Sequence, residues 1–200
     1  MRRASLLIML VGLILMLVSA SLQKAGADAH SPHDNWSWLK DTYWYVPQEN
    51  LPAVETTLSP LAHQLISDQT VWHIEDYAEG YFWGKQVVKL STNDQYLCMQ
   101  LVGSITPQGD IQMTFTFTLP PAVPPALNLK VSGLGKMRRV RGTWQPEMQM
   151  TTGVSSLVTH WAFMKQCQPG EACNQALPGV ELPLQDFLGV CPCASDPLCP

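Results

Sequence analysis

Apolar and polar residues alternate along much of this chain. The clearest case is residues 111–119, where Ile, Met, Phe, Phe and Leu alternate with Gln and Thr. A period of two places apolar side chains on one face of a β-strand and polar side chains on the other. We predict further strands at residues 42–46, 69–77, 81–90, 95–102, 127–131, 136–143, 144–151 and 155–165.

Turn residues separate these segments. Ala78-Glu79-Gly80 and Thr106-Pro107-Gln108-Gly109 suit tight turns, and Gly133-Leu134-Gly135 also predicts one. Residues 119–127 contain four prolines, which favours an extended crossover rather than a strand. Short turns between about eight strands are typical of an antiparallel fold.

We predict one helix before the main series of strands, at residues 56–68. Thr57 suits the N-cap and Pro60 the first turn. Four apolar residues fall near one helical face: Leu58, Leu61, Leu65 and Ile66. We therefore expect an all-β fold: a single antiparallel β-barrel or β-sandwich of about eight strands, with one short N-terminal helix. Barrels of the lipocalin type share this strand count, but the tryptophan that opens their first strand is not at the corresponding place, so the likeness concerns shape alone.

The first residues have the layout of a signal peptide. Arg2 and Arg3 precede an apolar run at residues 6–18, and Ala25-Gly26-Ala27 suits a cleavage site. The run is shorter than the roughly 20 residues that cross a bilayer. We predict a signal peptide at residues 1–27 and a periplasmic or extracellular location. The alternative is an uncleaved N-terminal anchor, the only contact with a membrane that we expect.

Residues 28–41 are polar, so we predict that they form an exposed lead-in to a β domain at residues 42–166.

The charge balance argues against two classes of partner. The 200 residues have a formal net charge of −4. The charged residues of the predicted leader are all basic, so cleavage makes the remaining chain more acidic. Nucleic acids and anionic lipids attract clustered Lys and Arg. We therefore expect no nucleic-acid partner.

The cysteines agree with export. All six follow the leader, and an even number in an exported chain predicts disulfides: Cys98, Cys167, Cys173, Cys191, Cys193 and Cys199. Pro169-Gly170 supplies a turn between Cys167 and Cys173, which predicts a local pair. Alternation turns Leu97, Met99 and Leu101 toward the core and Cys98 outward, so we expect Cys98 to bridge to the cysteines at 191–199. The Pro/Cys-rich tail, residues 167–200, then packs outside the sheet, with a short helix at 184–188.

The predicted mature N-terminus suits a divalent metal. Cleavage after Ala27 leaves Asp28-Ala29-His30, whose amine, two amides and imidazole form a square-planar nitrogen set for Cu(II) or Ni(II). This start resembles the amino-terminal copper site of serum albumins over three residues only. A cut elsewhere abolishes the site, and a histidine in third position also occurs by chance. We predict no other cofactor.

Three residues are candidates for catalysis. His73 and Glu75 share one strand parity and suit a base with its orienting carboxylate, and His160 is the third candidate. The alternatives are a surface ion pair for His73 and a buried His160 bonded to a backbone carbonyl. No phosphate loop, dinucleotide fingerprint or hydrolase motif is present in the sequence.

Tryptophan supplies candidates for ligand binding. Seven tryptophans are many for this length, and they serve either as core residues or as stacking surfaces. Four of those in predicted strands are the candidates for ligand binding: Trp72, Trp83, Trp144 and Trp161. Met148 and Met150 share parity with Trp144, which favours core packing over copper ligation.

We interpret the chain as an exported binding protein for an unknown ligand, such as a small apolar molecule in a barrel mouth. The alternatives are an envelope hydrolase that uses the His and carboxylate residues, and a structural or accessory envelope component whose partner is another protein.

Overall fold

A computed structural model describes residues 34–47, 52–92, 94–117, 130–153, 156–167 and 175–191. The predicted leader, the anchor alternative and the Asp28-Ala29-His30 site lie outside these residues. No helix in the described ranges is long and apolar enough to cross a membrane.

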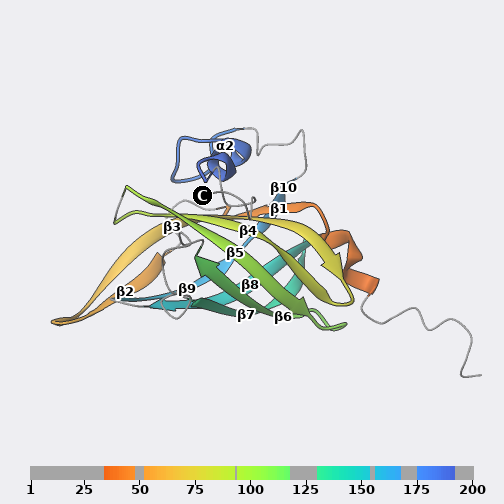
Figure 1. Ribbon diagram of the computed structural model, residues 1–200, viewed down its shortest axis with the longest axis horizontal. Coiled ribbons are helices and arrows are strands. Elements are labelled where there is room, and N and C mark those ends of the chain that lie inside the picture. Colours follow the sequence, from red (N-terminus) through yellow and green to blue (C-terminus); the bar gives the residue numbers. More distant parts are fainter. Residues whose placement is uncertain are drawn as a thin grey trace, which may run out of the picture. The chain divides into compact units, whose positions relative to one another are not determined.

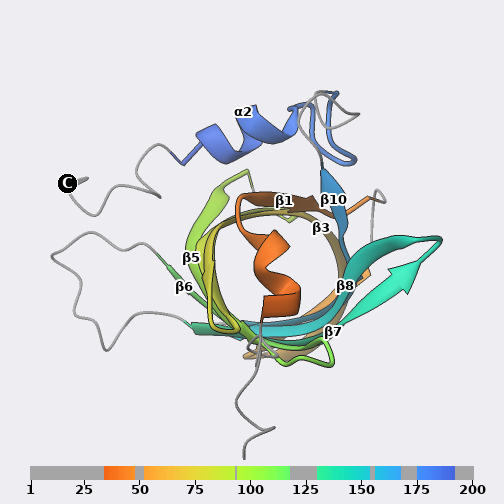
Figure 2. The same cartoon turned by 90° about the vertical axis from the view of Figure 1, so that its right-hand side faces the viewer.

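Eight antiparallel strands form a closed ring (Figures 1 and 2). Neighbouring strands pair in the order β3-β2-β9-β8-β7-β6-β5-β4, and a β3–β4 pairing closes the ring into a barrel. Two short strands outside the ring, β1 and β10, pair with each other, and β1 also pairs with β3. The prediction of a mainly β, antiparallel fold is confirmed. The strands are β1 (Thr42–Tyr45), β2 (Pro52–Leu58), β3 (Leu61–Ala78), β4 (Tyr81–Leu90), β5 (Tyr96–Ile105), β6 (Asp110–Phe117), β7 (Lys130–Val140), β8 (Thr143–Gly153), β9 (Ser156–Phe163) and β10 (Lys165–Cys167).

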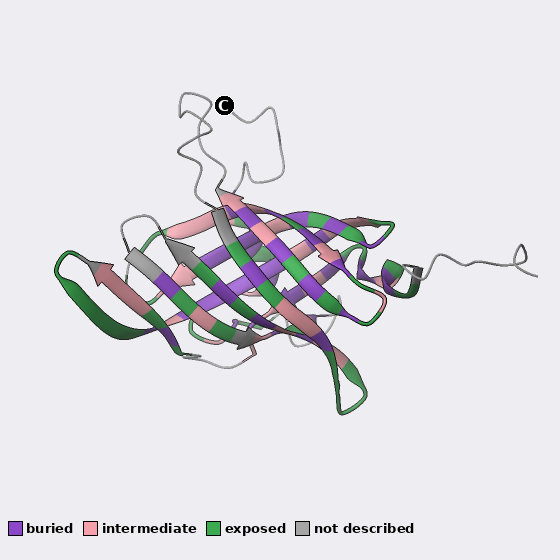
Figure 3. Ribbon diagram, turned by 90° about the horizontal axis from the view of Figure 1, so that it is seen from below, coloured by how far each residue is buried: buried purple, intermediate pink, exposed green. Residues whose placement is uncertain are grey.

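Burial alternates along the strands (Figure 3). In β6, Met113 and Phe115 are buried, whereas Gln112 is exposed. The apolar side chains fill the barrel and the polar ones face outward, as the period of two predicts. The largest fully buried side chains include Trp44, Trp72, Phe82 and Phe115.

A 3-10 helix, η2 (Asp34–Leu39), closes one end of the barrel; Figure 2 shows it in orange within the ring. Trp36 is only 5% exposed, its Nε1 donates to the carbonyl of Thr106 at 2.9 Å, and its ring meets Trp144 edge-on at 5.0 Å. The lead-in at 28–41, predicted to be exposed, carries two buried side chains, Trp36 and Leu39, in its described part. The physical reason is that packing these side chains against the apolar rings at this end of the barrel removes apolar surface from water.

The helix predicted at residues 56–68 is wrong. This segment forms the hairpin between β2 and β3, in which Thr56 pairs with His63. Pro60 lies in the turn, and its carbonyl accepts a hydrogen bond from Thr57 Oγ1 at 3.0 Å. The helical spacing of leucines is overridden because β2 completes the ring by pairing with both β3 and β9.

The turn predicted at Gly133-Leu134-Gly135 is also wrong, since β7 continues through it. Gly133 pairs with Met150 and Gly135 with Met148. The absent side chains leave room for the two thioethers inside the barrel. The chain turns at Arg141-Gly142, where φ is 49° and 87°, close to the predicted boundary between the strands at 136–143 and 144–151.

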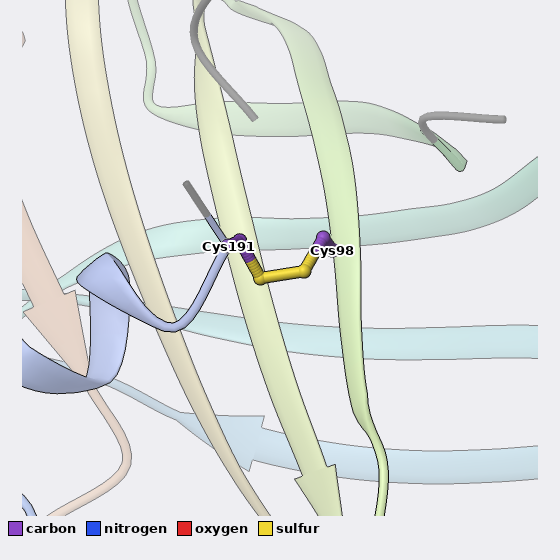
Figure 4. The surroundings of a disulfide bond; sticks show 2 residues. All are labelled: Cys98 and Cys191. Atoms are coloured by element: carbon purple, nitrogen blue, oxygen red, sulfur yellow. A yellow bond between two sulfur atoms is a disulfide. The ribbon is translucent and has the colours of Figure 1, made fainter. Parts of the chain in front are cut away.

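The tail packs on the outside of the barrel, as predicted. Helix α2 (Leu184–Gly189) buries Leu184 and Phe187 in a cluster with Val71 and Val87 of β3 and β4. A disulfide joins Cys98 on β5 to Cys191, which follows α2 (Figure 4). The predicted bridge from Cys98 to the tail is therefore confirmed. Cys167 is disulfide-bonded as well. Cys173, the predicted partner of Cys167, lies outside the described ranges, as do Cys193 and Cys199.

Candidate functional site

The two ends of the barrel interior differ in packing. Toward η2, the space between Leu39, Trp44, Trp72 and their neighbours is only about 10 Å³. Toward the opposite end lies a cavity of about 50 Å³. Six apolar side chains line it: Val88, Leu90, Leu97, Met99, Met150 and Val158. Four polar side chains of the described residues line it as well: Asp68, Thr70, Gln86 and His160.

Asp68 is the most unusual group in this cavity. Its side chain is 3% exposed, and its Oδ2 accepts a hydrogen bond from Thr70 Oγ1 at 2.8 Å. Its Oδ1 is buried and receives no hydrogen bond. A buried carboxylate oxygen without a donor is costly, so this oxygen has capacity for one more partner.

His160 faces the same carboxylate from β9, which is separated from β3 by the single strand β2. Its Nδ1 lies 3.5 Å from Asp68 Oδ1. The two atoms are within ion-pair distance but do not form a hydrogen bond. The side chain is 9% exposed. Residue parity turns His160 inward because Trp161, its neighbour on β9, faces outward and is 45% exposed. The fold thus brings two groups that are distant in sequence to one cavity wall.

Gln86 supports the floor of the cavity. Its Oε1 accepts a hydrogen bond from Trp72 Nε1 at 2.7 Å, and both side chains are buried. The indole of Trp72 therefore has its polar atom satisfied, as buried tryptophan requires. This bond fixes the orientation of Gln86 beside Thr70 and Asp68.

No known protein family, curated protein or solved structure matches this chain. Its function therefore has to be inferred from the arrangement of its own residues. The cavity combines apolar walls with few polar groups, which is typical of small-molecule sites.

The predicted pair of His73 and Glu75 lies elsewhere, on the outer face of β3. The two side chains do point the same way, with His73 Nδ1 3.8 Å from Glu75 Oε1. His73 Nε2 lies 3.0 Å from Asp41 Oδ1, and the imidazole stacks on Tyr43 at 4.1 Å. Burial, followed by the nearby Asp41 charge, raises the pKa of the Tyr43 phenol. His73 is thus held by its neighbours on this outer surface and does not line the cavity.

The four tryptophans predicted for ligand binding are not brought together. Trp72 and Trp144 pack in or against the core inside the barrel. Trp83 and Trp161 face outward from different strands, with 40% and 45% of their surface exposed. None of the four lines the cavity between Asp68 and His160.

Metal-binding groups are few in the part of the chain that the structure describes. It contains no cluster of three or more His, Cys, Asp or Glu side chains that could hold a metal ion. Asp68 and His160 offer two ligands, one fewer than protein-bound zinc commonly takes. Met148 and Met150 are buried in the core cluster, as their parity predicts.

Sequence reasoning identified His160 but missed Asp68. The reason is that Asp68 stood at the end of the wrongly predicted helix, so no strand parity was assigned to it. Extending the alternation of β3 back from Trp72 through Thr70 would have turned Asp68 inward. Its pairing with His160 has no local signal, because the two strands meet only when the barrel closes.

Proposed function

We propose that this chain is an exported binding protein that takes a small, mostly apolar molecule into the open end of its barrel. The observation that carries the proposal is the cavity between Asp68 and His160, which has six apolar side chains in its lining. Barrel mouths are common ligand sites, because the strands form a rigid wall around a space that is closed at one end. Here η2 supplies the closed end.

The size of the cavity limits the ligand. A volume of about 50 Å³ accommodates roughly three to five waters at the 10–15 Å³ that each needs. A larger molecule enters only if side chains move. Met99 and Met150 suit this role because the unbranched thioether adapts its rotamers readily. Leu90 and Leu97 also line the cavity and are only partly buried.

Dye binding tests this proposal. N-phenyl-1-naphthylamine, a neutral dye that fluoresces in apolar surroundings, should bind with saturation. Val88→Phe places a ring in the cavity and should weaken binding at least ten-fold, because Val88 is buried in its wall. Val102→Phe is the matched control, since Val102 is 56% exposed on the outer face.

Three results contradict cavity binding. They are the absence of saturable dye binding to the wild-type protein, an equal effect of both valine variants, and no effect of Val88→Phe. Thermal unfolding of each variant shows whether the barrel has formed. If Val88→Phe does not fold, Leu97→Phe replaces it, because the partly buried Leu97 tolerates a larger ring more easily.

Export is the second half of the proposal. The Cys98–Cys191 disulfide supports it, since such bonds persist mainly in oxidising compartments. We expect intact-mass measurement of the chain from a secreting host to show loss of residues 1–27 and no free thiol. A retained leader favours the anchored alternative, and reduced thiols in the purified native protein contradict export.

A hydrolytic function is the second candidate, favoured by the approach of His160 to Asp68 within a cavity. The hydroxyl of Thr70 argues against it, because it donates to Asp68 and is not directed at the imidazole as an activated nucleophile would be. Turnover of p-nitrophenyl butyrate that is lost in His160→Gln would support hydrolysis over binding alone.

A further inference from the structure

We infer that the molecule bound in this cavity carries a protonated amine, which docks on Asp68 while its apolar body lies along the barrel wall. The inference rests on the proposed function and adds the chemical class of the ligand. It starts from a buried carboxylate that faces a cavity and has one oxygen, Asp68 Oδ1, without a hydrogen-bond donor.

The carboxylate of Asp68 is only half satisfied. Thr70 donates to Oδ2, but Oδ1 is fully buried and accepts nothing. An ionised carboxylate has about four acceptor sites, and an unmatched charge in an apolar interior is strongly disfavoured. A donor that enters the cavity removes this penalty, so the site favours ligands that carry one.

The sign of the charge follows from the groups that line the cavity. Among the described residues that line it, Asp68 and His160 are the only ionisable ones, and the others are Thr70, Gln86 and apolar side chains. These lining residues contain one carboxylate, that of Asp68, and no lysine or arginine. A carboxylate or phosphate head group would be repelled in this low-dielectric setting, whereas an ammonium group is attracted and donates up to three hydrogen bonds.

His160 leaves room for this partner. Its Nδ1 approaches Asp68 Oδ1 at 3.5 Å without forming a hydrogen bond. An imidazole that carries a single N–H has one acceptor nitrogen, which can receive a second hydrogen from the same ammonium group. Together the two side chains form a small acceptor site on one cavity wall.

A metal ion fits this site less well than an amine. Structural and catalytic zinc sites use at least three protein ligands, whereas the described part of the lining offers two typical metal-binding side chains, Asp68 and His160. The described residues supply no cluster of three. The apolar side chains of Leu90, Leu97 and Met99 instead match the hydrocarbon of an organic cation.

Three probes of equal chain length test the inference on the wild-type protein. Octylammonium, octanol and octanoate are each titrated against bound N-phenyl-1-naphthylamine below their aggregation limits. We expect octylammonium to displace the dye at least ten-fold more tightly than octanol, and octanoate more weakly than octanol. Equal displacement by octylammonium and octanol overturns the amine inference but leaves the binding function intact. Failure of all three probes and of the dye contradicts the binding function itself.

A pair of charge-matched variants locates the head group. Asp68→Asn removes the charge with little change in shape and should lower octylammonium affinity at least ten-fold, with octanol affinity changed less than three-fold. Asp76→Asn is the control, because Asp76 lies on the same strand but pairs with Lys40 at 2.7 Å on the surface. Equal losses in both variants would assign the preference to general charge and overturn docking on Asp68. If Asp68→Asn does not fold, the wild-type series still decides between the amine and its neutral analogue.

Discussion

Gly135 of β7 lies directly opposite Met148 of β8, and the missing side chain of the glycine is what admits the methionine sulfur into the barrel. A Cβ at position 135 would overlap Met148 Sδ and the carbonyl oxygen of Glu147. Met148 is fully buried. The glycine is therefore a packing residue within a strand rather than a turn residue.

Gly135→Ala should destabilise the protein. The added methyl group meets a backbone carbonyl that cannot rotate away, so the strands must separate locally. Overpacking of this kind typically costs about 1–3 kcal/mol. Urea unfolding followed by tryptophan fluorescence measures the loss.

Gly189→Ala is the matched control for this substitution. Nothing lies within 4 Å of a Cβ at the end of α2, so the free energy of unfolding should change by less than about 0.5 kcal/mol. An equal loss in the two variants would contradict the packing role of Gly135.

Local patterns in the sequence predicted the strands and their faces well. Met99 and Leu101 point inward, and Cys98 points outward to its disulfide with Cys191. This agreement has a physical cause: the alternation of neighbouring side chains is set by the backbone of a single strand. The short helix at 184–188 was likewise recognised from local sequence and corresponds to α2.

Features that depend on contacts between distant strands were not predictable in this way. Gly135 resembles a turn residue until Met148 is placed opposite it. Leu61 and Leu65 have helical spacing, yet they lie exposed on a hairpin strand because β2 pairs with β3 and β9. The acceptor site of Asp68 and His160 also exists only after the ring closes.

Removing the disulfide should loosen the tail and lower stability. Cys98 and Cys191 are 93 residues apart, so the bond restricts a long loop in the unfolded chain. Cys98→Ser combined with Cys191→Ser should reduce the free energy of unfolding by about 2–4 kcal/mol. Hydrogen exchange should show the largest loss of protection at α2. An unchanged unfolding midpoint would mean that the apolar contacts of Phe187 hold α2 without the bond.

The tryptophan that closes the barrel end should be a major contributor to stability. Trp36 is 5% exposed, so Trp36→Ala opens a large cavity and should cost about 3–5 kcal/mol. Trp36→Phe keeps a ring but loses the hydrogen bond to Thr106 and should cost less. The control is Trp83→Ala, since Trp83 is 40% exposed on the outer face. If that surface variant is as damaging as Trp36→Ala, η2 does not seal the barrel as described.

The raised pKa of Tyr43 predicts a loss of stability at alkaline pH. Burial of the phenol, followed by the charge of Asp41, lifts its pKa above the ordinary value of 10.0, and a hydrogen bond with Gln185 of α2 acts in the opposite direction. As pH rises through 10.0, the phenol ionises in the unfolded chain before it does so in the folded protein, so the unfolded state gains stability. The effect is absent below that pH and is complete once pH exceeds the folded-state pKa.

Urea unfolding between pH 8 and pH 11 measures this linkage. Tyr43→Phe should flatten the decline in stability above pH 10, whereas Tyr81→Phe, which removes a phenol that is 60% exposed, should retain the wild-type slope. Comparing the two variants cancels the titration of lysines and other tyrosines. Identical slopes in both variants would mean that ionisation of Tyr43 is not coupled to unfolding.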